Sequence, residues 1–532
     1  MVFFFDSIFV STKINLSSME FDVIQSYFTP YHTFLLNAIV IFVFFVFAYI
    51  FEVENSTKVT KYIALGGTFL VFAHSIGLLA CAFKSSDVNP QLRVKVFSYF
   101  SKYFISHTPE MNVTGLSIFF IILSTFITLI VIVQAWNEYR TEQNEYLLCF
   151  LLIELFLILA FTIDDLLIFF IAFEVVLMPM YIIIGRWGSR EEKIKAAYWF
   201  FLFTLLGSVL FLYSIIKLYS IYRTTNFTKL IEYIDSDAEK NMYDQNFMFF
   251  MRLIWVFLFI AFAVKVPLFP SHVWLPEAHV EAPTGGSMVL AALLLKLGGY
   301  GILKFLFAGK VFKTIALEYA PFIIVICSLG ALFGALTAIR QVDAKRLIAY
   351  SSVSHMNFCV MGIFTGDQLG ISGAILLMIA HGFVSASLFF LIGVMYERTG
   401  TRLVSAYTGQ CHVMPVFSFF LIFNCLANAG FPGLATFHTE CLIVMSLISK
   451  NFVIAVFSAV VLFFAGVYTI WFLNRVVFGG VYKALHNAPG YYGYSDIDFR
   501  EVAILILLAL PNVYVGLQPL TLYSLVSLLS TI

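Results

Sequence analysis

FAVKVPLFPSHVWLPEAHVEAPTGGSMVLAALLLKLGGYG, residues 262–301, carries two lysines, Lys265 and Lys296, through long runs of apolar residues. A lysine at the centre of a membrane helix costs about 2.5–3.5 kcal/mol on insertion scales, so each needs a partner or a function. The same stretch contains the prolines Pro267, Pro270, Pro276 and Pro283. Because proline removes a backbone donor, one straight helix cannot hold all of them. We expect a helix that breaks inside the membrane and lines a polar cavity there.

The composition of the 532-residue chain is that of an integral membrane protein, since 61% of its residues are hydrophobic and only 12% are charged. The formal net charge is zero, which gives no basis for nucleic-acid binding. The seven cysteines fall singly in or beside apolar runs, which favours hydrophobic packing over metal binding. Haem, iron–sulfur and dinucleotide motifs are absent from the sequence, so we expect no redox chemistry in this polypeptide.

Apolar windows long enough to cross a bilayer, about 18–25 residues, occur fourteen times along the chain. They lie at residues 34–51, 63–83, 113–134, 146–163, 166–184, 198–219, 253–269, 284–303, 320–339, 346–364, 370–395, 413–449, 452–474 and 502–527. The sequence therefore predicts an all-α, polytopic membrane protein with about 14 transmembrane helices.

The twelfth window is interrupted by NAGFPGLATF, residues 428–437, so it resembles the proline-broken seventh window. Helices 7 and 12 are five apart, which makes helices 4–8 and 9–13 candidate five-helix repeats, the second inverted relative to the first. Paired discontinuous helices in corresponding positions point to a transport site. The expected domains are 1–145 (helices 1–3 and loops), 146–308 (first repeat), 309–477 (second, inverted repeat) and 478–532 (C-terminal loop and helix 14).

Four charged residues lie deep in apolar helices. Glu174, in IFFIAFEVVLMPMY, and Glu440, in FHTECLIVM, join Lys265 and Lys296. Burial favours the neutral form of a carboxylate or an ammonium group, whereas an opposite charge nearby favours the charged form. A Glu–Lys pair that forms and separates therefore takes up and releases a proton. The alternative for each residue is a buried ion pair or a packing contact without a transport role.

Two histidines, His355 in YSSVSHMNF and His381 in MIAHGFVSASLFF, lie in predicted helices 10 and 11. Histidine suits proton relay because it changes charge near neutral pH, although a lone histidine on a polar helix face can also be a simple hydrogen-bonding residue. The candidates for a metal site are His272, Glu277 and His279. A proline breaks their helical spacing and no third strong ligand accompanies them, which favours solvated or capping roles.

Five runs of the chain together resemble one known family. They are DDLLIFFIAFEVVLMPMYIIIGRWGS, FAVKVPLFPSHVWLPEAHVEAPTGGS, VLAALLLKLGGYG, QVDAKRLIAYSSVSHMN and HGFVSASLFFLIGVMYERTGTR. The chain is similar to the family of subunit 4 of mitochondrial NADH:ubiquinone oxidoreductase, respiratory complex I, which is an antiporter-like proton-pumping subunit. The resemblance covers about residues 146–480 and weakens in the first 110 residues and in segment 220–252.

The resemblance implies a role for each candidate residue in proton translocation. Glu174 of helix 5 would be the partner of Lys265 in the broken helix 7. Lys296 of helix 8 would be the central relay. His355 and His381 would carry the path onward, toward the broken helix 12.

Glu440 would be the terminal site of this path, and glutamate there is typical of subunit 4 because its sister subunits usually have lysine. The family usually has a glycine before this glutamate, whereas this chain has Thr439, preceded by His438. Residues two apart on a helix point about 200° from each other. We therefore expect His438 to face away from Glu440, with helix 12 resumed by residue 436. A longer break would instead bring both side chains into one water-filled cavity.

The resemblance also implies that this chain holds no cofactor, and that NAD, FMN, iron–sulfur clusters and ubiquinone bind to partner subunits. The expected partners are other complex I subunits, including the sister antiporter-like subunits, and lipids of the mitochondrial inner membrane, cardiolipin among them. Two other functions stay open. One is a cation/proton antiporter subunit of the related family, and the other is a structural membrane scaffold whose buried charges only pair.

Overall fold

The computed structural model describes residues 30–50, 56–84, 92–95, 110–137, 142–240, 245–480, 495–519 and 523. Its α-helices are α3 (Pro30–Ile50), α4 (Ser56–Lys84), α6 (Gly115–Gln134), α7 (Gln143–Thr162), α8 (Leu166–Val175), α9 (Leu177–Trp187), α10 (Lys193–Tyr222), α11 (Phe227–Lys240), α12 (Gln245–Lys265), α13 (Trp274–Glu281), α14 (Thr284–Val289), α15 (Leu295–Gly301), α16 (Gly309–Ile339), α17 (Ala344–Phe364), α18 (Gln368–Thr399), α19 (Gln410–Val413), α20 (Pro415–Asn428), α21 (Ala435–Lys450), α22 (Phe452–Val476) and α24 (Phe499–Leu517). Two π-helical turns, η2 (Leu290–Leu294) and η3 (Ile302–Leu306), flank α15. A short antiparallel sheet joins β1 (Leu92–Lys95) to β2 (Glu110–Val113).

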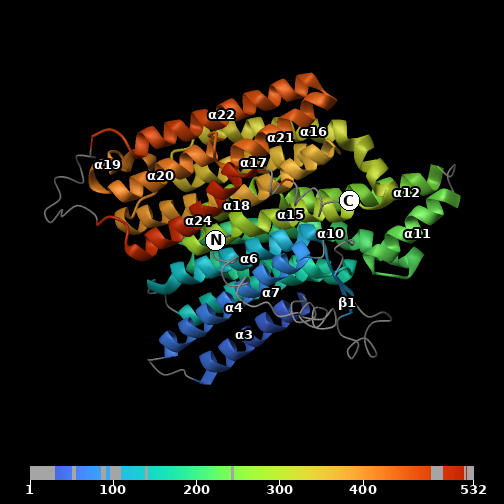
Figure 1. The fold of residues 1–532 in the computed structure, drawn as a ribbon, viewed down its shortest axis with the longest axis horizontal. Coiled ribbons are helices and arrows are strands. Elements are labelled where there is room, and N and C mark those ends of the chain that lie inside the picture. Colours follow the sequence, from blue (N-terminus) through green and yellow to red (C-terminus); the bar gives the residue numbers. More distant parts are fainter. Residues whose placement is uncertain are drawn as a thin grey trace, which may run out of the picture.

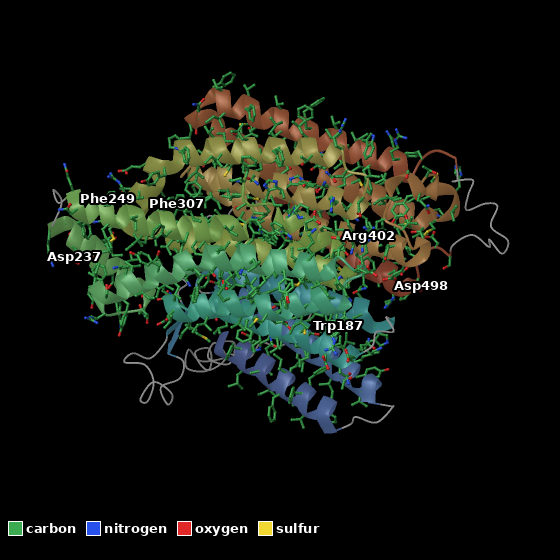
Figure 2. The ribbon with its side chains drawn as sticks, turned by 180° about the vertical axis from the view of Figure 1, so that it is seen from behind. Trp187, Asp237, Phe249, Phe307, Arg402 and Asp498 are labelled. Atoms are coloured by element: carbon green, nitrogen blue, oxygen red, sulfur yellow. The ribbon has the colours of Figure 1, made fainter. Side chains whose placement is uncertain are left out.

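The long helices run roughly along one direction, with α3 and α4 at one edge of the bundle and α22 at the opposite edge (Figure 1). Helices α6, α7, α15 and α18 lie between these edges. The two ends of the bundle are marked in Figure 2, where Trp187, Arg402 and Asp498 lie at one end and Asp237 and Phe249 lie at the other. Many large apolar side chains of the long helices are exposed, as a protein that crosses a bilayer requires.

Each of the fourteen predicted spans contains a helix of the described structure. By length and composition, twelve of the described helices could cross a membrane, and Thr33–Phe47 and Pro415–Asn428 are shorter apolar helices. The last predicted span runs to residue 527, whereas α24 ends at Leu517, and residues 524–532 lie outside the described part of the chain. The all-α, polytopic membrane fold is confirmed.

The predicted break in helix 7 is confirmed, because α12 ends at Lys265 and α13 begins at Trp274. The carbonyl groups freed by this break find donors within the protein. The indole of Trp274 donates to the Val264 carbonyl at 3.0 Å, and the Asn357 amide of α17 donates to the Pro267 carbonyl at 3.3 Å. These bonds satisfy carbonyl groups at the break from within the protein, so the break needs no contact with lipid.

The predicted break in helix 12 is confirmed as well, because α20 ends at Asn428 and α21 begins at Ala435. The Thr436 hydroxyl donates to the Ala427 carbonyl, and the Asn512 side chain of α24 accepts from the Ala435 amide at 3.1 Å. Both broken helices are the fourth of their candidate repeats. The repeat boundaries at residues 145, 308 and 477 stay a prediction.

The structure contains two irregularities that the sequence analysis did not predict. Helix 5, expected as one span over 166–184, is interrupted at Val176, between α8 and α9. Pro179 lies in the first turn of α9 and cannot donate a helical hydrogen bond, which explains the interruption. Helix 8 is also irregular, since η2 and η3 widen it on either side of Lys296. Such π-turns often occur at functional sites.

Candidate functional site

Lys265 is the last residue of α12, where a positive charge is favoured by the helix dipole. Its ammonium group is buried and donates to the Phe173 carbonyl at 2.9 Å, and it lies 3.7 Å from the centre of the Phe173 ring. Because α8 ends two residues later, this carbonyl belongs to the last turn of the helix, which lacks helical partners. The unpredicted break in helix 5 therefore creates the acceptor that holds Lys265.

Glu174 is half-buried at the end of α8, and one of its carboxylate oxygens has no hydrogen bond. It interacts electrostatically with Lys265, and Ser208 of α10 faces it. The two charged groups nevertheless form no direct ion pair, because Lys265 is bound to the backbone instead. The structure thus places the predicted partners together in an open arrangement, with their charges separated.

Lys296 is completely buried at the start of α15. Its ammonium group donates to the Ala291 carbonyl in η2 at 2.5 Å and lies 2.8 Å from Nδ1 of His381 on α18. A neutral His381 accepts a hydrogen bond from Lys296 at this nitrogen, so the pair can share a proton. Helix α12 contacts α15 as well, because the side chain of Lys265 packs against Gly298 of α15.

His355 and Glu440 continue from this pair. The rings of His355 and His381 lie 5.7 Å apart, and Nδ1 of His355 lies 3.4 Å from a carboxylate oxygen of Glu440 on α21. All of these residues are at most 4% exposed. We call Lys296, His381, His355 and Glu440 the polar row. It leads through helices α15, α18, α17 and α21 to the break in helix 12.

Gly430 lies in that break and faces the end of the polar row. Its φ of 72° is in the left-handed region that favours glycine. A Cβ atom at this position would lie 2.5 Å from an oxygen of Glu440, so the carboxylate would have to move. Glycine is therefore favoured by the backbone conformation, and it lets the carboxylate of Glu440 approach the break.

Helix α21 has resumed at Ala435, so the expected restart by residue 436 is confirmed. The Thr439 hydroxyl donates to the Thr436 carbonyl at 2.7 Å, which ties it to its own helix. His438 packs against the neighbouring Phe437 ring, with 5.6 Å between centroids, and forms no ion pair with Glu440. The role of His438 stays a prediction.

Sequence reasoning missed Tyr468 of α22. This side chain is completely buried, and its hydroxyl lies 3.4 Å from Nε2 of His355, on the side of the ring opposite Glu440. Ser351 and Asn428 also face this hydroxyl. A tyrosine in an apolar helix carries no sequence signal of such a contact, because nothing in α22 indicates that it packs against His355.

The candidates considered for a metal site have other partners. Glu277 accepts two hydrogen bonds from Arg346, at 2.9 and 3.1 Å, and the ring of His279 stacks on Phe389 with 4.4 Å between centroids. Within the described ranges, no group of three or more histidine, cysteine or acidic side chains could hold a metal ion. The residues instead contribute to ion pairing and packing.

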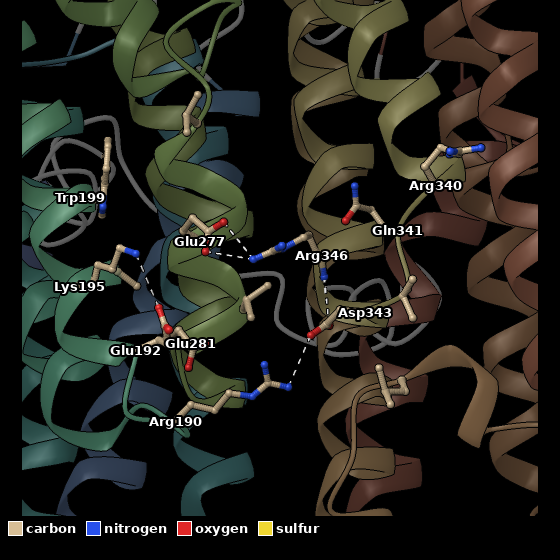
Figure 3. A pocket seen from close by; sticks show the side chains of 15 residues that line it. Arg190, Glu192, Lys195, Trp199, Glu277, Glu281, Arg340, Gln341, Asp343 and Arg346 are labelled. Carbon is tan, nitrogen blue, oxygen red and sulfur yellow. Dashed lines mark hydrogen bonds and ion pairs between the residues drawn. The ribbon is translucent and has the colours of Figure 1, made fainter.

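A pocket of about 720 Å³ opens at the end of the bundle that carries Arg402 (Figures 2 and 3). Its walls come from the start of α10, from α13 and from the turn between α16 and α17. Charged side chains of both signs line it, and Arg190 lies 3.9 Å from Asp343 across it. The pocket therefore lies between the two candidate repeats, beside the second half of the broken helix 7.

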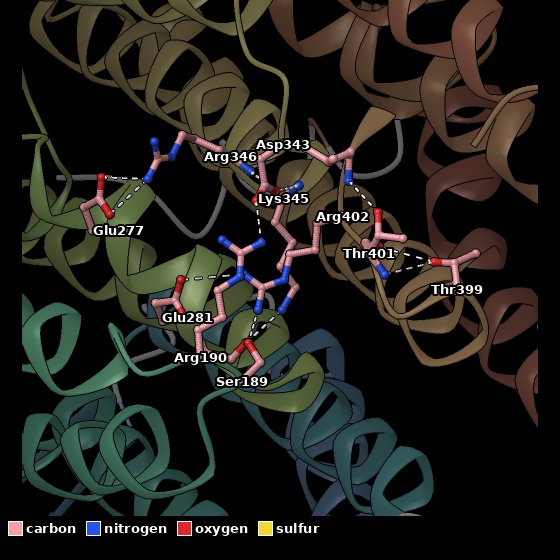
Figure 4. A network of polar contacts seen from close by, with 12 residues as sticks. Ser189, Arg190, Glu277, Glu281, Asp343, Lys345, Arg346, Thr399, Thr401 and Arg402 are labelled. Atoms are coloured by element: carbon pink, nitrogen blue, oxygen red, sulfur yellow. Dashed lines mark hydrogen bonds and ion pairs between the residues drawn. The ribbon is translucent and has the colours of Figure 1, made fainter. Parts of the chain in front are cut away.

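A buried network joins the repeats next to this pocket (Figure 4). Arg402 is 1% exposed, donates to the Ser189 hydroxyl and lies 3.7 Å from a carboxylate oxygen of Glu281. Lys345, at the start of α17, donates to the Ala282 carbonyl at 2.8 Å. Since Ala282 follows α13 directly, both cations hold the end of α13 against the second repeat.

Comparisons with known proteins show to which family the chain belongs. Residues 164–467 match the family model described as NADH:quinone oxidoreductase/Mrp antiporter, TM. The chain is 41% identical over 424 residues to NADH-ubiquinone oxidoreductase chain 4 of Chondrus crispus, covering 80% of this chain and 81% of the relative. It is 37% identical over 473 residues to the protein of the same name from Acanthamoeba castellanii, covering 88% of this chain and 91% of the relative.

The fold is similar to those of two solved assemblies. A chain of respiratory complex I from Thermus thermophilus with bound NADH matches with a TM-score of 0.77 at 23% identity, covering 94% of this chain and 99% of that chain. A chain of the Mrp complex from Dietzia sp. DQ12-45-1b matches with a TM-score of 0.79 at 18% identity, covering 94% and 97%. Together with the sequence relatives, the match over residues 164–467 shows that this chain belongs to the NADH:quinone oxidoreductase/Mrp antiporter transmembrane family and, within it, to the chain 4 group.

Proposed function

We propose that this chain is a proton-translocating membrane-arm subunit of an NADH:ubiquinone oxidoreductase, driven by electron transfer in partner subunits. The observation that carries this proposal is the polar row, in which four titratable side chains from four different helices follow one another through an apolar bundle. Ionisable groups inside a membrane are costly, and a continuous series of them is typical of proton relays.

The geometry of the polar row supports a stepwise transfer. Lys296 gives a proton to Nδ1 of His381, which lies within hydrogen-bond distance at 2.8 Å. His381 passes a proton to His355, whose ring centre lies 5.7 Å away, and His355 passes one to Glu440 across 3.4 Å. The two longer steps exceed a direct hydrogen bond, so each needs a bridging water molecule or a small movement.

Glu174 and Lys265 form the loading half of this proposal. When the pair closes, the carboxylate stabilises the protonated form of Lys265. When the pair opens, burial destabilises this protonated form, and the lysine releases its proton. The contact between Lys265 and Gly298 connects this pair to the helix that carries Lys296. A change at the pair can therefore reach the polar row through one packing contact.

A double-mutant cycle tests whether Glu174 and Lys265 act as a pair. Glu174→Gln and Lys265→Met should each reduce proton translocation severely, since each removes one charge and leaves the opposite charge without its partner. The double variant should be less than additive, with a coupling of about 0.5–3 kcal/mol. Proton-to-electron ratios of the assembled complex measure this coupling. If the double variant gives the plain sum of both effects, the two residues do not interact.

The same proposal specifies the partner subunits and the membrane of this chain. Its partners are the other subunits of the complex, including sister antiporter-like subunits, and these partners bind NAD, FMN, the iron–sulfur clusters and ubiquinone. The membrane is the mitochondrial inner membrane, and cardiolipin is among the lipids that contact the exposed apolar side chains. The first repeat, residues 146–308, loads protons, and the second, residues 309–477, releases them.

Native gel electrophoresis tests the assembly directly. We expect the chain, solubilised in mild detergent, to migrate with a large complex that oxidises NADH in the gel. A chain that migrates alone, or with a complex lacking NADH oxidation, would contradict the proposed function.

A cation/proton antiporter subunit is the second candidate, favoured by the fold shared with the Mrp complex. It predicts that proton movement in reconstituted vesicles depends on sodium or potassium without NADH. The proposed function predicts movement that depends on NADH and quinone, whichever of these cations is present.

A further inference from the structure

Glu154, in the middle of α7, is an acid that the proposed path does not use. Its side chain is 0% exposed, and neither carboxyl oxygen has a hydrogen bond. Helix α7 packs against α3, α4 and α6, on the side of the bundle away from α21 and α22 (Figure 1). Glu154 is therefore separate from the polar row, which runs toward α21.

The charged side chains on the helices around α7 are engaged elsewhere. Lys61 of α4 donates to the Trp136 carbonyl at 2.8 Å, and Arg186 of α9 pairs with Glu142 and Glu145. The other titratable groups on these helices include His74, Tyr62, Glu174 and Tyr181. No described residue forms an ion pair with Glu154, so an ionised Glu154 would be a buried charge without a counter-charge. Such a charge costs far more than the neutral acid.

Thr128 of α6 faces Glu154. The hydroxyl of Thr128 already donates to the carbonyl of Ser124 at 3.0 Å and to that of Thr125 at 3.1 Å. In this arrangement its one hydrogen points to these carbonyls, so its oxygen faces Glu154 as an acceptor until the hydroxyl rotates. A carboxylate has no hydrogen to offer, whereas a carboxylic acid does. The environment thus suits a protonated Glu154.

Buried hydroxyl groups follow α6 on both sides of this position. The Ser117 hydroxyl lies 3.0 Å from the Tyr300 hydroxyl, and the Thr125 hydroxyl lies 3.0 Å from that of Ser75. We call Ser117, Ser124, Thr125 and Thr128 the hydroxyl track. It extends from the first turn of α6 to within two turns of its end, in a helix of 20 residues, which is long enough to cross the hydrocarbon core.

We propose that Glu154 is a second proton-binding site in the membrane, a neutral carboxylic acid at rest that exchanges its proton with solvent along the hydroxyl track. The site is independent of the polar row, because it shares no residue or hydrogen bond with it. Its ligand is a proton, held by a carboxyl group whose neighbours offer acceptors and no positive charge.

Infrared difference spectroscopy of the intact, resting complex tests the protonation of Glu154. The spectrum of wild type minus Glu154→Gln should contain the carbonyl stretch of a protonated carboxylic acid at neutral pH. Glu145→Gln is the matched control, because Glu145 lies on the same helix but is exposed and paired with Arg186. That control should lose only a carboxylate band. If Glu154→Gln also loses only a carboxylate band, Glu154 is ionised and the proposal fails.

Transfer into D₂O tests the exchange. The acid band of Glu154 should move to lower frequency, and Thr128→Val, which replaces the hydroxyl with a methyl group, should slow this shift severalfold. A band that never shifts, or one that shifts equally fast in Thr128→Val, would overturn the hydroxyl track. Because the complex is at rest, without NADH, these outcomes do not depend on proton pumping.

Discussion

Replacing Lys296 with alanine is expected to stop proton translocation through this chain while the complex still assembles. The lysine is the first member of the polar row, and alanine leaves Nδ1 of His381 without its proton donor. Proton transfer by a positioned side chain contributes roughly 10²–10⁴-fold, so the flux through this chain should fall by about 100-fold or more. The measurement is the ratio of protons translocated to electrons transferred in vesicles containing the intact complex.

Lys296→Arg distinguishes proton transfer from charge alone. Arginine keeps a positive charge but does not give up its proton, so this variant should be nearly as damaging as alanine. Lys310→Ala is a suitable control, because Lys310 pairs with Glu239 at the exposed end of α16, away from the polar row. A normal ratio in assembled Lys296→Ala would exclude the relay and favour a scaffold whose buried charges only stabilise the fold.

Glu440→Gln should have an effect of similar size, because it removes the last acid of the polar row without changing the size of the side chain. Glutamine still fits against Gly430, yet it cannot receive a proton from His355. We again expect a loss of about 100-fold or more in flux through this chain. The ratio of protons to electrons, measured as for Lys296, reports the loss.

His438→Ala is the matched control for Glu440→Gln, since both residues lie in the first turns of α21. The helix has resumed at Ala435, which points the two side chains in different directions. The alanine variant should therefore pump almost normally. If it loses pumping as completely as Glu440→Gln does, the histidine belongs to the outlet and the helical geometry is not the one that operates during turnover.

The two large breaks could be predicted from sequence because their cause is local. Pro267 and Pro270 remove backbone donors, and Gly430 and Gly433 permit left-handed conformations, wherever the surrounding helices pack. The break at Val176 has a local cause as well, since Pro179 lies in the interior of the predicted span 166–184, and sequence reasoning could have included it. The π-turns beside Lys296, in contrast, depend on packing between helices, which no local pattern encodes.

The candidate residues were predictable in part for a similar reason. A charge in an apolar helix stands out, which identified Lys265, Lys296, Glu174 and Glu440. Their order along the path came from the family resemblance, because spacing in sequence does not indicate which helices touch. No sequence feature distinguishes Tyr468 from the other tyrosines among the 27 of the chain. Glu154, however, carries the same signal as Glu174, an isolated acid in the apolar run LLIELFLIL, and sequence reasoning could have included it.

The open arrangement of Glu174 and Lys265 leaves unused a Coulomb energy that can be compared with the work of moving a charge across the membrane. Two opposite charges brought to 4 Å gain about 4 kcal/mol at an effective dielectric constant of 20. Moving one elementary charge across a membrane requires roughly 2.3 kcal/mol for every 100 mV. In the proposed function, closing and reopening this single contact exchanges an amount of energy comparable to the electrical work of moving one proton. The hydrogen bond to the Phe173 carbonyl keeps Lys265 away from Glu174 and so maintains the separation of the two charges.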